Sequence, residues 1–310
     1  MEDGTMQEKR FPSNPIALAT LPWKKDWSFD KEAFAREVEM LQSKKIFTIY
    51  YGCTAGEGYA LTNTQYREIT SFFADIMKGY EYPPMVSVIS TSMAEMIERV
   101  EMIKSYGIHD IMFTLPSWGT LRPSEVGLFL HGLMDAHPDC RFLHYNNSLR
   151  SKVRLYAEDY EKYAKEIPNF VAVKQALATP LDVRLMAERD VPLQEFYMEY
   201  LYTYACMFSN PSYLVSMLCI NYDKAIEYYE AGQRKDFKKL TQMDMQIQKA
   251  SDVFDKALPH ERIDGAYDKL FTKMHIPEFS KELYPPYEGV SDQEYEGLLA
   301  ALKTELPDWF

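Results

Sequence analysis

The sequence lacks several features that mark specialised classes of protein. Its four cysteines are scattered and form no CxxC pair, which argues against a disulfide framework and fits a reducing compartment. No apolar stretch approaches the roughly 20 residues that span a bilayer, and the first ten residues lack the apolar core of a secretory signal. A formal net charge of −12 opposes binding to nucleic acid or to an anionic membrane surface. We therefore expect a cytoplasmic globular protein.

Motifs of two common enzyme classes are also missing. No GxGxxG follows the first apolar run, so the doubly wound dinucleotide-binding fold, the rival architecture, lacks its usual mark. The six histidines show neither HExxH nor another paired ligand spacing, and we expect no metal site. Glycine is absent between Gly132 and Gly232, which opposes a glycine-rich phosphate cradle in that stretch.

Eight short apolar runs alternate with segments of helical periodicity, at a spacing typical of parallel βα units. The simplest closed arrangement of eight such units is a (β/α)8 TIM barrel, which belongs to the α/β class. We expect a polar leader over 1–13, the barrel over 14–235 and a C-terminal helical appendage over 236–310. The predicted strands are 15–20, 46–51, 85–89, 108–114, 140–145, 170–174, 193–198 and 213–217, and the predicted barrel helices are 29–43, 62–78, 92–106, 123–136, 156–166, 180–189 and 223–232.

One buried strand ends in a single lysine, in the run Asn-Phe-Val-Ala-Val-Lys-Gln-Ala at 169–176. Burying an ammonium is costly unless it is paired or its pKa falls. Without its proton, Lys174 is a nucleophilic amine that can form a Schiff base with a carbonyl substrate. The alternative is a strand-end lysine whose ammonium reaches solvent along its apolar stem.

The carboxyl ends of barrel strands form the active site, and two further segments at these ends fit Schiff-base chemistry. Tyr145, one strand before Lys174, can move a proton near the imine carbon. The turn at 52–56 offers backbone N–H groups and the Thr54 hydroxyl to a substrate carboxylate, with Cys53 and Ala55 beside it.

Four other strand-end residues are candidates for substrate binding. Arg150 follows the fifth strand and can bind a second carboxylate with its planar guanidinium. Thr20 and Trp118 follow the first and fourth strands. Glu199 follows the seventh strand and can contact substrate or remain a solvated loop acid.

Taken together, these segments resemble the dihydrodipicolinate synthase / N-acetylneuraminate lyase family of class I aldolases, from about Asn14 to the carboxyl terminus. The matching pieces are Ala-Thr-Leu-Pro at 19–22, Gly-Cys-Thr-Ala-Gly-Glu at 52–57, Thr-Leu-Pro-Ser-Trp at 114–118, Tyr-Asn at 145–146 and Val-Lys at 173–174. The resemblance implies that Lys174 forms an imine with pyruvate or another 2-oxo acid and that Tyr145 carries the proton. It implies that the turn holds the pyruvate carboxylate and that Arg150 binds the carboxylate of a second substrate. It also implies no external cofactor and a homotetramer or tight dimer.

The sequence departs from the family at three places. The turn carries one extra residue, so the hydroxyl roles fall to Cys53 or Thr54. Trp118 stands where the synthase has a relay tyrosine and cannot pass a proton through a hydroxyl, which opposes dihydrodipicolinate synthesis itself. Bulky residues at 196–204 and 212–216 replace the family's strand-end glycines and predict a narrower, more aromatic pocket.

These observations favour a Schiff-base lyase that makes or breaks a carbon–carbon bond next to a 2-oxo acid. In this hypothesis Lys174, Tyr145 and Thr54 are catalytic, and the expected partners are the small-molecule 2-oxo acid and further copies of the same chain, with neither nucleic acid nor membrane. A dehydratase that uses the same imine is the nearest alternative. A barrel that binds 2-oxo acids without catalysis is the second class of hypothesis.

Overall fold

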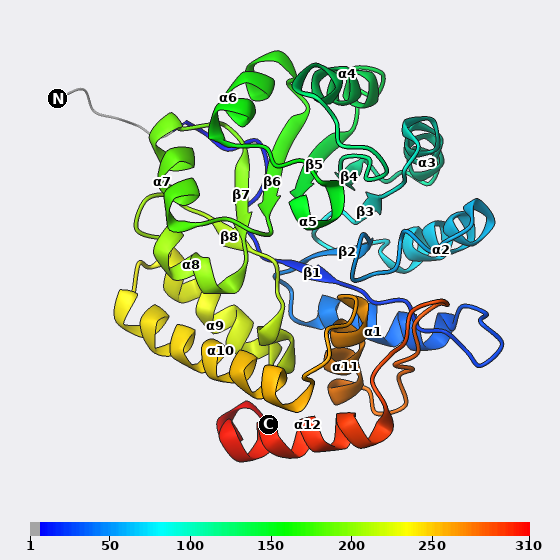
Figure 1. Ribbon diagram of the computed structural model, residues 1–310, viewed down its shortest axis with the longest axis vertical. Helices are drawn as coiled ribbons and strands as arrows, with labels where there is room; N and C mark the ends of the chain where they lie inside the picture. Colours follow the sequence, from blue (N-terminus) through cyan, green and yellow to red (C-terminus); the bar gives the residue numbers. More distant parts are fainter. Residues whose placement is uncertain (1–6) are drawn as a thin grey trace.

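The computed structural model describes residues 7–310, which form a ring of parallel strands surrounded by helices (Figure 1). Each strand pairs in parallel with the next strand in the chain, from β1 to β8. A parallel bridge between Ile16 and Leu214 joins the last strand to the first, and the Val215 N–H donates to the Ile16 carbonyl at 3.0 Å. The predicted α/β barrel is confirmed. The strands are β1 (Ile16–Leu18), β2 (Thr48–Gly52), β3 (Met85–Val88), β4 (Asp110–Phe113), β5 (Arg141–Asn146), β6 (Phe170–Gln175), β7 (Gln194–Tyr197) and β8 (Ser212–Tyr213).

Helices follow the strands where the sequence provides caps and an apolar face. Thr62 caps α2 in a capping box with Gln65, and Thr179 caps α7, which Pro180 begins. The helices are α1 (Lys31–Ser43), α2 (Asn63–Ile76), α3 (Met93–Ser105), α4 (Pro123–Met134), α5 (Ser148–Ser151), α6 (Ala157–Glu166), α7 (Pro180–Arg189), α8 (Glu199–Ala205), α9 (Tyr222–Gln233), α10 (Phe237–Ala257), α11 (Gly265–His275) and α12 (Asp292–Glu305), with 3₁₀ turns η1 (Met217–Ile220) and η2 (Pro307–Trp309).

Three short helices at the carboxyl ends of strands, α5, α8 and η1, were not predicted. The segment after β7, Glu-Tyr-Leu-Tyr-Thr-Tyr-Ala, has the β-branched and aromatic content of a strand, yet it forms helix α8. Strand β8 shrinks to two residues because η1 begins directly after Ser216. Tertiary packing overrides local propensity in both segments.

Side chains alternate between the barrel interior and the layer of helices. Leu143, Tyr145 and Phe196 point into the interior cluster, whereas Phe142 and Val173 join the larger cluster under the helices. Tyr202 and Tyr213 also lie in this outer layer, with ring centroids 4.7 Å apart. Tyr202 and Tyr213 therefore do not narrow the pocket as predicted, and the bulky side chains of these segments that pack in the barrel interior are Phe196 and Leu214.

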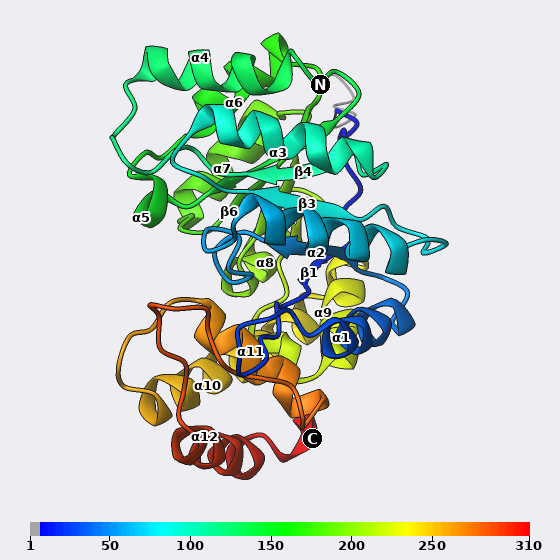
Figure 2. The same ribbon diagram turned by 90° about the vertical axis from the view of Figure 1, so that its right-hand side faces the viewer.

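The C-terminal helices α10, α11 and α12 gather at one end of the molecule in the view of Figure 2, opposite α3 and α4. Gly265, the first residue of α11, approaches the loop after β2 so closely that a Cβ would lie 2.7 Å from the Ala55 carbonyl oxygen. The appendage therefore contacts the carboxyl end of the barrel. No helix of residues 7–310 is long and apolar enough to cross a bilayer.

Candidate active site

Lys174 lies inside the barrel at the carboxyl end of β6, with only 2% of its surface exposed. It pairs across the sheet with Tyr145 of β5, and its Nζ lies 3.8 Å from the centre of the tyrosine ring. Burial lowers the pKa of Lys174 to about 8, although Cys53, Asp264 and Asp268 act in the opposite direction. The free amine is thus a minor form at pH 7 but far more populated than in an exposed lysine, as a nucleophilic lysine requires.

Tyr145 is buried, and its hydroxyl accepts a hydrogen bond from Asn147 Nδ2 at 3.1 Å. Burial raises the pKa of this phenol well above its ordinary value, so the hydroxyl keeps its proton in the resting site. A neutral phenol against an amine can donate a proton and take it back. This is the arrangement that the sequence predicted for these two residues.

The turn after β2 folds tightly around glycines and forms a cradle. Gly52 and Cys53 have φ values of 89° and 61°, and the Gly56 N–H donates to the Gly52 carbonyl at 3.1 Å. A Cβ at Gly56 would lie 2.3 Å from that carbonyl oxygen, so only glycine fits there. Burial raises the pKa of the Cys53 thiol, which makes it an uncharged neighbour of the lysine.

Thr54 Oγ1 is buried in this turn and has no hydrogen-bond partner among the described residues. Buried hydroxyls in folded proteins nearly always have a partner. The hydroxyl lies beside the Cys53 thiol, whose pKa it helps to lower, and no N or O atom of the described residues holds it. The expected role of the turn in carboxylate binding stays a prediction.

Among the other described residues with a buried oxygen that lacks a hydrogen-bond partner, three lie in or just after β3, β5 and the loop that follows β2, namely Ser87 Oγ, Asn147 Oδ1 and Tyr59 OH. Ser87 lies beside Gly52, and Asn147 lies beside Tyr145. The sequence analysis did not identify these three residues as candidates. Only their position could have indicated them, since each lies at or just after the carboxyl end of a strand or in the loop that follows β2.

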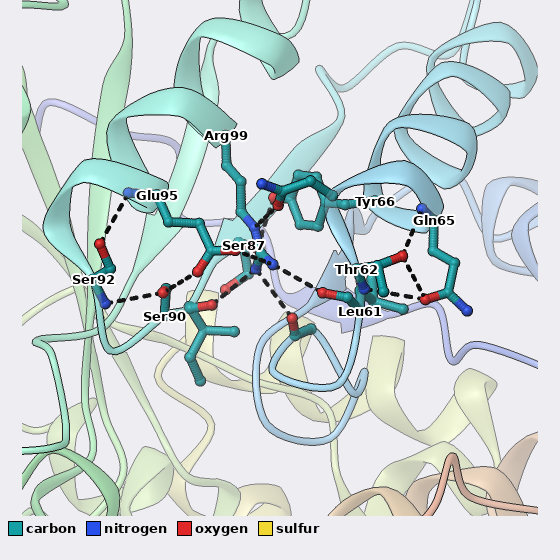
Figure 3. Close-up of polar contacts among 12 residues, drawn as sticks. Leu61, Thr62, Gln65, Tyr66, Ser87, Ser90, Ser92, Glu95 and Arg99 are labelled. Atoms are coloured by element: carbon teal, nitrogen blue, oxygen red, sulfur yellow. Dashed lines mark hydrogen bonds and ion pairs between the residues drawn. The ribbon is translucent and has the colours of Figure 1, made fainter.

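Arg99 of α3 reaches the loop that follows β2 and binds its backbone carbonyls, as Figure 3 shows. Its guanidinium donates to the carbonyls of Gly58, Leu61 and Ile89 at 2.9–3.2 Å and lies 4.6 Å from the centre of the Tyr66 ring. Glu95 completes the set at 3.2 Å. Five N–H donors in a fixed plane thus tie the end of the β2 loop to the end of β3.

Glu57 anchors the same turn to the C-terminal region. Its carboxylate forms a fully buried ion pair with Lys269 of α11 and accepts from Trp23 Nε1 at 3.0 Å and from the Tyr284 N–H at 2.6 Å. A buried carboxylate with several donors is firmly held, and removal of one partner leaves an unpaired buried charge. The turn is therefore fixed by α3 on one side and by α11 on the other.

Helix α11 also brings two carboxylates toward the lysine. Asp264, which precedes the helix, and Asp268, one turn later, both act on the ammonium of Lys174. Burial raises the pKa of Asp268 to about 7, with Asp264 adding to the effect. These two residues lie about 90 positions after Lys174 in the sequence, and no strand-end pattern marks them.

Arg150 does not have a free guanidinium in this structure. It pairs with Asp264 at 3.2 Å and lines an open cleft of about 610 Å³ with His260, Arg262 and Tyr287. Its predicted role as a carboxylate ligand stays a prediction and requires that Asp264 release it.

Two predicted contacts with substrate need correction, because their polar atoms are used inside the protein. The Thr20 hydroxyl and N–H both donate to Glu37 at 2.9–3.0 Å, in a buried cluster with Thr272. Both Glu199 oxygens accept backbone N–H groups at 2.7–3.1 Å, from residues 216–218 at the start of η1. Glu199 is buried, and neither a solvated acid nor a free ligand.

The remaining predicted site residues lie at the edge of the mouth. Trp118 is 84% exposed, and its carbonyl accepts from Lys152 Nζ at 3.0 Å. Ala55 borders the interior cluster, and its carbonyl oxygen faces Gly265. Within this chain the Trp118 side chain does not enter the barrel.

A possible group of metal ligands, which the sequence spacing did not reveal, lies at the opposite end of the barrel. Atoms of His109, Asp139 and Cys140, which precede β4 and β5, lie within 4.8 Å of one another. The Asp139 carboxylate is already bound to the Lys104 ammonium at 3.0 Å. This group lies apart from the candidate active site, and the expectation of a metal-free enzyme stays a prediction.

Known proteins resemble this chain in both sequence and fold. The 4-hydroxy-tetrahydrodipicolinate synthase of Methanothrix thermoacetophila is 27% identical over 168 residues, which cover 54% of this chain and 55% of that enzyme. The synthase of Parabacteroides distasonis is 28% identical over 163 residues, 52% of this chain and 53% of the relative. The chain thus matches about half the length of these curated relatives.

Solved structures extend the likeness of fold to nearly the whole chain. A prophage protein of the dihydrodipicolinic acid synthase family from E. coli K12, crystallised in complex with pyruvate, superposes with a TM-score of 0.84 at 13% identity, covering 94% of this chain and 98% of that one. Dihydrodipicolinate synthase from Aquifex aeolicus gives a TM-score of 0.84 at 17% identity, with the same shares of each chain. The model of the dihydrodipicolinate synthetase family matches residues 12–191, and the chain belongs to this family.

Proposed function

We propose that this protein is a Schiff-base-forming lyase or aldolase that acts on a 2-oxo acid of the pyruvate type. The observation that carries the proposal is the buried Lys174, whose pKa falls to about 8 beside the Tyr145 ring. Family membership supports it, and so does the pyruvate in the crystal structure of the E. coli relative. The free Thr54 hydroxyl and the N–H groups of the turn are suited to the carboxylate of the acid.

In the proposed reaction the Lys174 amine adds to the keto carbon and a water molecule leaves, which gives an iminium ion. Loss of a proton from the neighbouring carbon gives an enamine. The enamine carbon then bonds to the carbonyl carbon of an aldehyde, whose oxygen takes up a proton. Water hydrolyses the new iminium and frees the lysine, and the reverse sequence breaks the same bond. We assign the proton transfers in these steps to Tyr145, and its contact with Lys174 supports the assignment.

The direct test is reduction of the protein with borohydride in the presence of pyruvate, followed by peptide mass spectrometry. We expect a reduced pyruvyl adduct on Lys174 and none in Lys174→Ala. Lys152→Ala, which changes an exposed lysine at the edge of the mouth, is the matched control and keeps the adduct. No adduct with pyruvate or with longer 2-oxo acids contradicts the proposal and favours a barrel that binds such acids without an imine.

The dehydratase alternative uses the same imine and expels a hydroxyl group from the adjacent carbon as water. Product analysis separates the two reactions. A lyase or aldolase couples or releases an aldehyde, whereas a dehydratase changes neither the number of carbon atoms nor the chain length of the acid. The proposed oligomer, a homotetramer or dimer, stays a prediction that sedimentation of the purified protein tests.

A further inference from the structure

A cavity of about 280 Å³ lies between η1, α10 and α11, and Ser216 and Met217, which follow β8, line it together with Asp264 and Asp268. It lies near the lysine site, because Gly265, next to Asp264, packs against Ala55, which borders the interior cluster that contains Tyr145. The two carboxylates also favour the ammonium of Lys174. The rest of the lining is largely apolar. Phe254 and Leu258 come from the α10 side and Tyr267 and Phe271 from α11, and Asp255 of α10 completes it.

The charges around this cavity are all of one sign. Its described lining includes three carboxylates and neither lysine nor arginine. Arg150, a cation outside this lining, is paired with Asp264 at 3.2 Å, and Lys174 is the residue that becomes the imine in the proposed reaction. Arg262 in the neighbouring cleft is held by Glu294 at 2.6 Å.

The backbone groups that could bind an anion here are occupied as well. The N–H groups of Ser216, Met217 and Leu218 at the start of η1 would form an anion site, but both oxygens of the buried Glu199 accept their hydrogen bonds. An anionic ligand would therefore meet carboxylates on one wall and no free donor from η1. A ligand with an apolar face and N–H or O–H donors would match the remaining groups.

We propose that this cavity holds the aldehyde-derived part of the substrate, and that this part is uncharged, with an apolar face against α10 and hydrogen-bond donors toward Asp264 and Asp268. The inference rests on the proposed function, because it assigns the partner of the enamine formed on Lys174. It defines a class of acceptor aldehyde that carries no carboxylate or phosphate. Asp264 and Asp268 are then the residues that determine specificity.

The test is run above pH 8, where Asp268 with its pKa of about 7 is a carboxylate. It compares two aldehydes of the same shape, 4-formylbenzamide and 4-formylbenzoate, as partners of pyruvate with the full-length protein. Like charges placed close together cost several kcal/mol, so we expect kcat/KM to be at least about tenfold higher for the amide. Asp268→Asn should reduce that ratio several-fold, whereas Asp252→Asn, on the exposed face of α10, should leave it unchanged. The ratio cancels any change in the reactivity of Lys174 that is common to both aldehydes.

Equal or faster reaction of 4-formylbenzoate overturns the inference and places the acceptor in the cleft beside Arg150. The borohydride adduct, measured on the same preparation, keeps the two proposals apart. An adduct without the expected preference refutes only the cavity assignment, and a missing adduct refutes the proposed function.

If neither aldehyde condenses, the same question is asked by binding. The protein with a reduced pyruvyl adduct on Lys174 is titrated calorimetrically with 4-(hydroxymethyl)benzamide and 4-(hydroxymethyl)benzoate. Tighter binding of the amide, weakened by Asp268→Asn, supports the inference. Equal binding, tighter binding of the benzoate, or no binding of either overturns it.

Discussion

Lys174, Tyr145 and the turn at 52–58 come from β6, β5 and the end of β2, and all lie within the residues that the family model matches. The acidic cavity is built by η1, α10 and α11, which follow the end of that match at Val191. We call these regions the lysine side and the acidic side. On the lysine side the polar groups are free hydroxyls and an amine of lowered pKa, whereas on the acidic side they are carboxylates.

The contrast separates two requirements of a reaction that joins two molecules. Imine chemistry fixes the lysine, the phenol and a carboxylate cradle, whatever the second substrate is. In our proposal the second substrate is recognised by residues that are free to differ, and these come from another part of the chain. The proposed acceptor class follows from this division.

The largest expected effect is a loss of stability when the buried ion pair between Glu57 of the lysine side and Lys269 of α11 is broken. Glu57→Ala leaves the Lys269 ammonium buried without a partner, and we expect the free energy of unfolding to fall by about 3–5 kcal/mol. Urea denaturation measures this loss. Asp75→Ala, which breaks an exposed ion pair with Lys78, is the control and should change stability by less than about 1 kcal/mol. If Glu57→Ala also lowered the free energy of unfolding by less than about 1 kcal/mol, this ion pair would not couple the two sides.

Tyr145→Phe tests the lysine side alone. Removal of the hydroxyl deletes the proposed proton carrier but keeps the ring beside Lys174, so we expect kcat to fall about a hundredfold or more. Steady-state kinetics measures the fall, and borohydride trapping should still give the pyruvyl adduct. Unchanged kcat would assign proton transfer to another group.

Thr54→Val has a smaller expected effect, on binding. The substitution keeps the shape of the buried side chain and removes the free hydroxyl, which would donate to the pyruvate carboxylate. A hydrogen bond to a charged group contributes about 1.5–3 kcal/mol, so KM for pyruvate should rise about tenfold or more with little change in kcat. An unchanged KM would leave the backbone N–H groups as the whole cradle.

The smallest expected effect is a shift with pH. The rate of imine trapping should rise with pH as the Lys174 ammonium loses its proton around pH 8 and then level off. Cys53, Tyr145, Asp264 and Asp268 are the titratable groups that face it. Because a carboxylate favours the ammonium, Asp268→Asn should lower the pKa of Lys174 and move the rise to lower pH. A shift to higher pH would mean that Asp268 does not act on the lysine as a negative charge.

The lysine side could be predicted from the sequence because its residues follow local rules. A β-branched run that ends in lysine marks a strand end, and the parallel order of strands places Tyr145 next to it. The tyrosines after β7 were placed wrongly because the segment forms α8, and a change from a two-residue to a 3.6-residue period reverses which side chains point inward.

Asp264 and Asp268 could not be predicted for a different reason. Their place depends on where α11 packs, and that depends on contacts between residues more than 200 positions apart, such as Glu57 with Tyr284. Thr20 and Glu199 were wrongly assigned to substrate for a similar reason. Their hydrogen-bond partners inside the protein, Glu37 and the N–H groups of η1, are distant in the sequence and are recognised only in the folded structure.

The α11 segment carries two rows of residues, and each row contacts a different part of the protein. Gly265 and Lys269, one turn apart, hold the turn of the lysine side, and Asp264 and Asp268 form the neighbouring row along the cavity. Successive residues of a helix are rotated by about 100°, so the adjacent side chains of Asp268 and Lys269 point to different neighbours, the cavity and Glu57. For protein engineering, position 268 is therefore the one to change in order to alter the proposed acceptor preference, while Lys269 must be kept to hold the turn that we propose binds the 2-oxo acid.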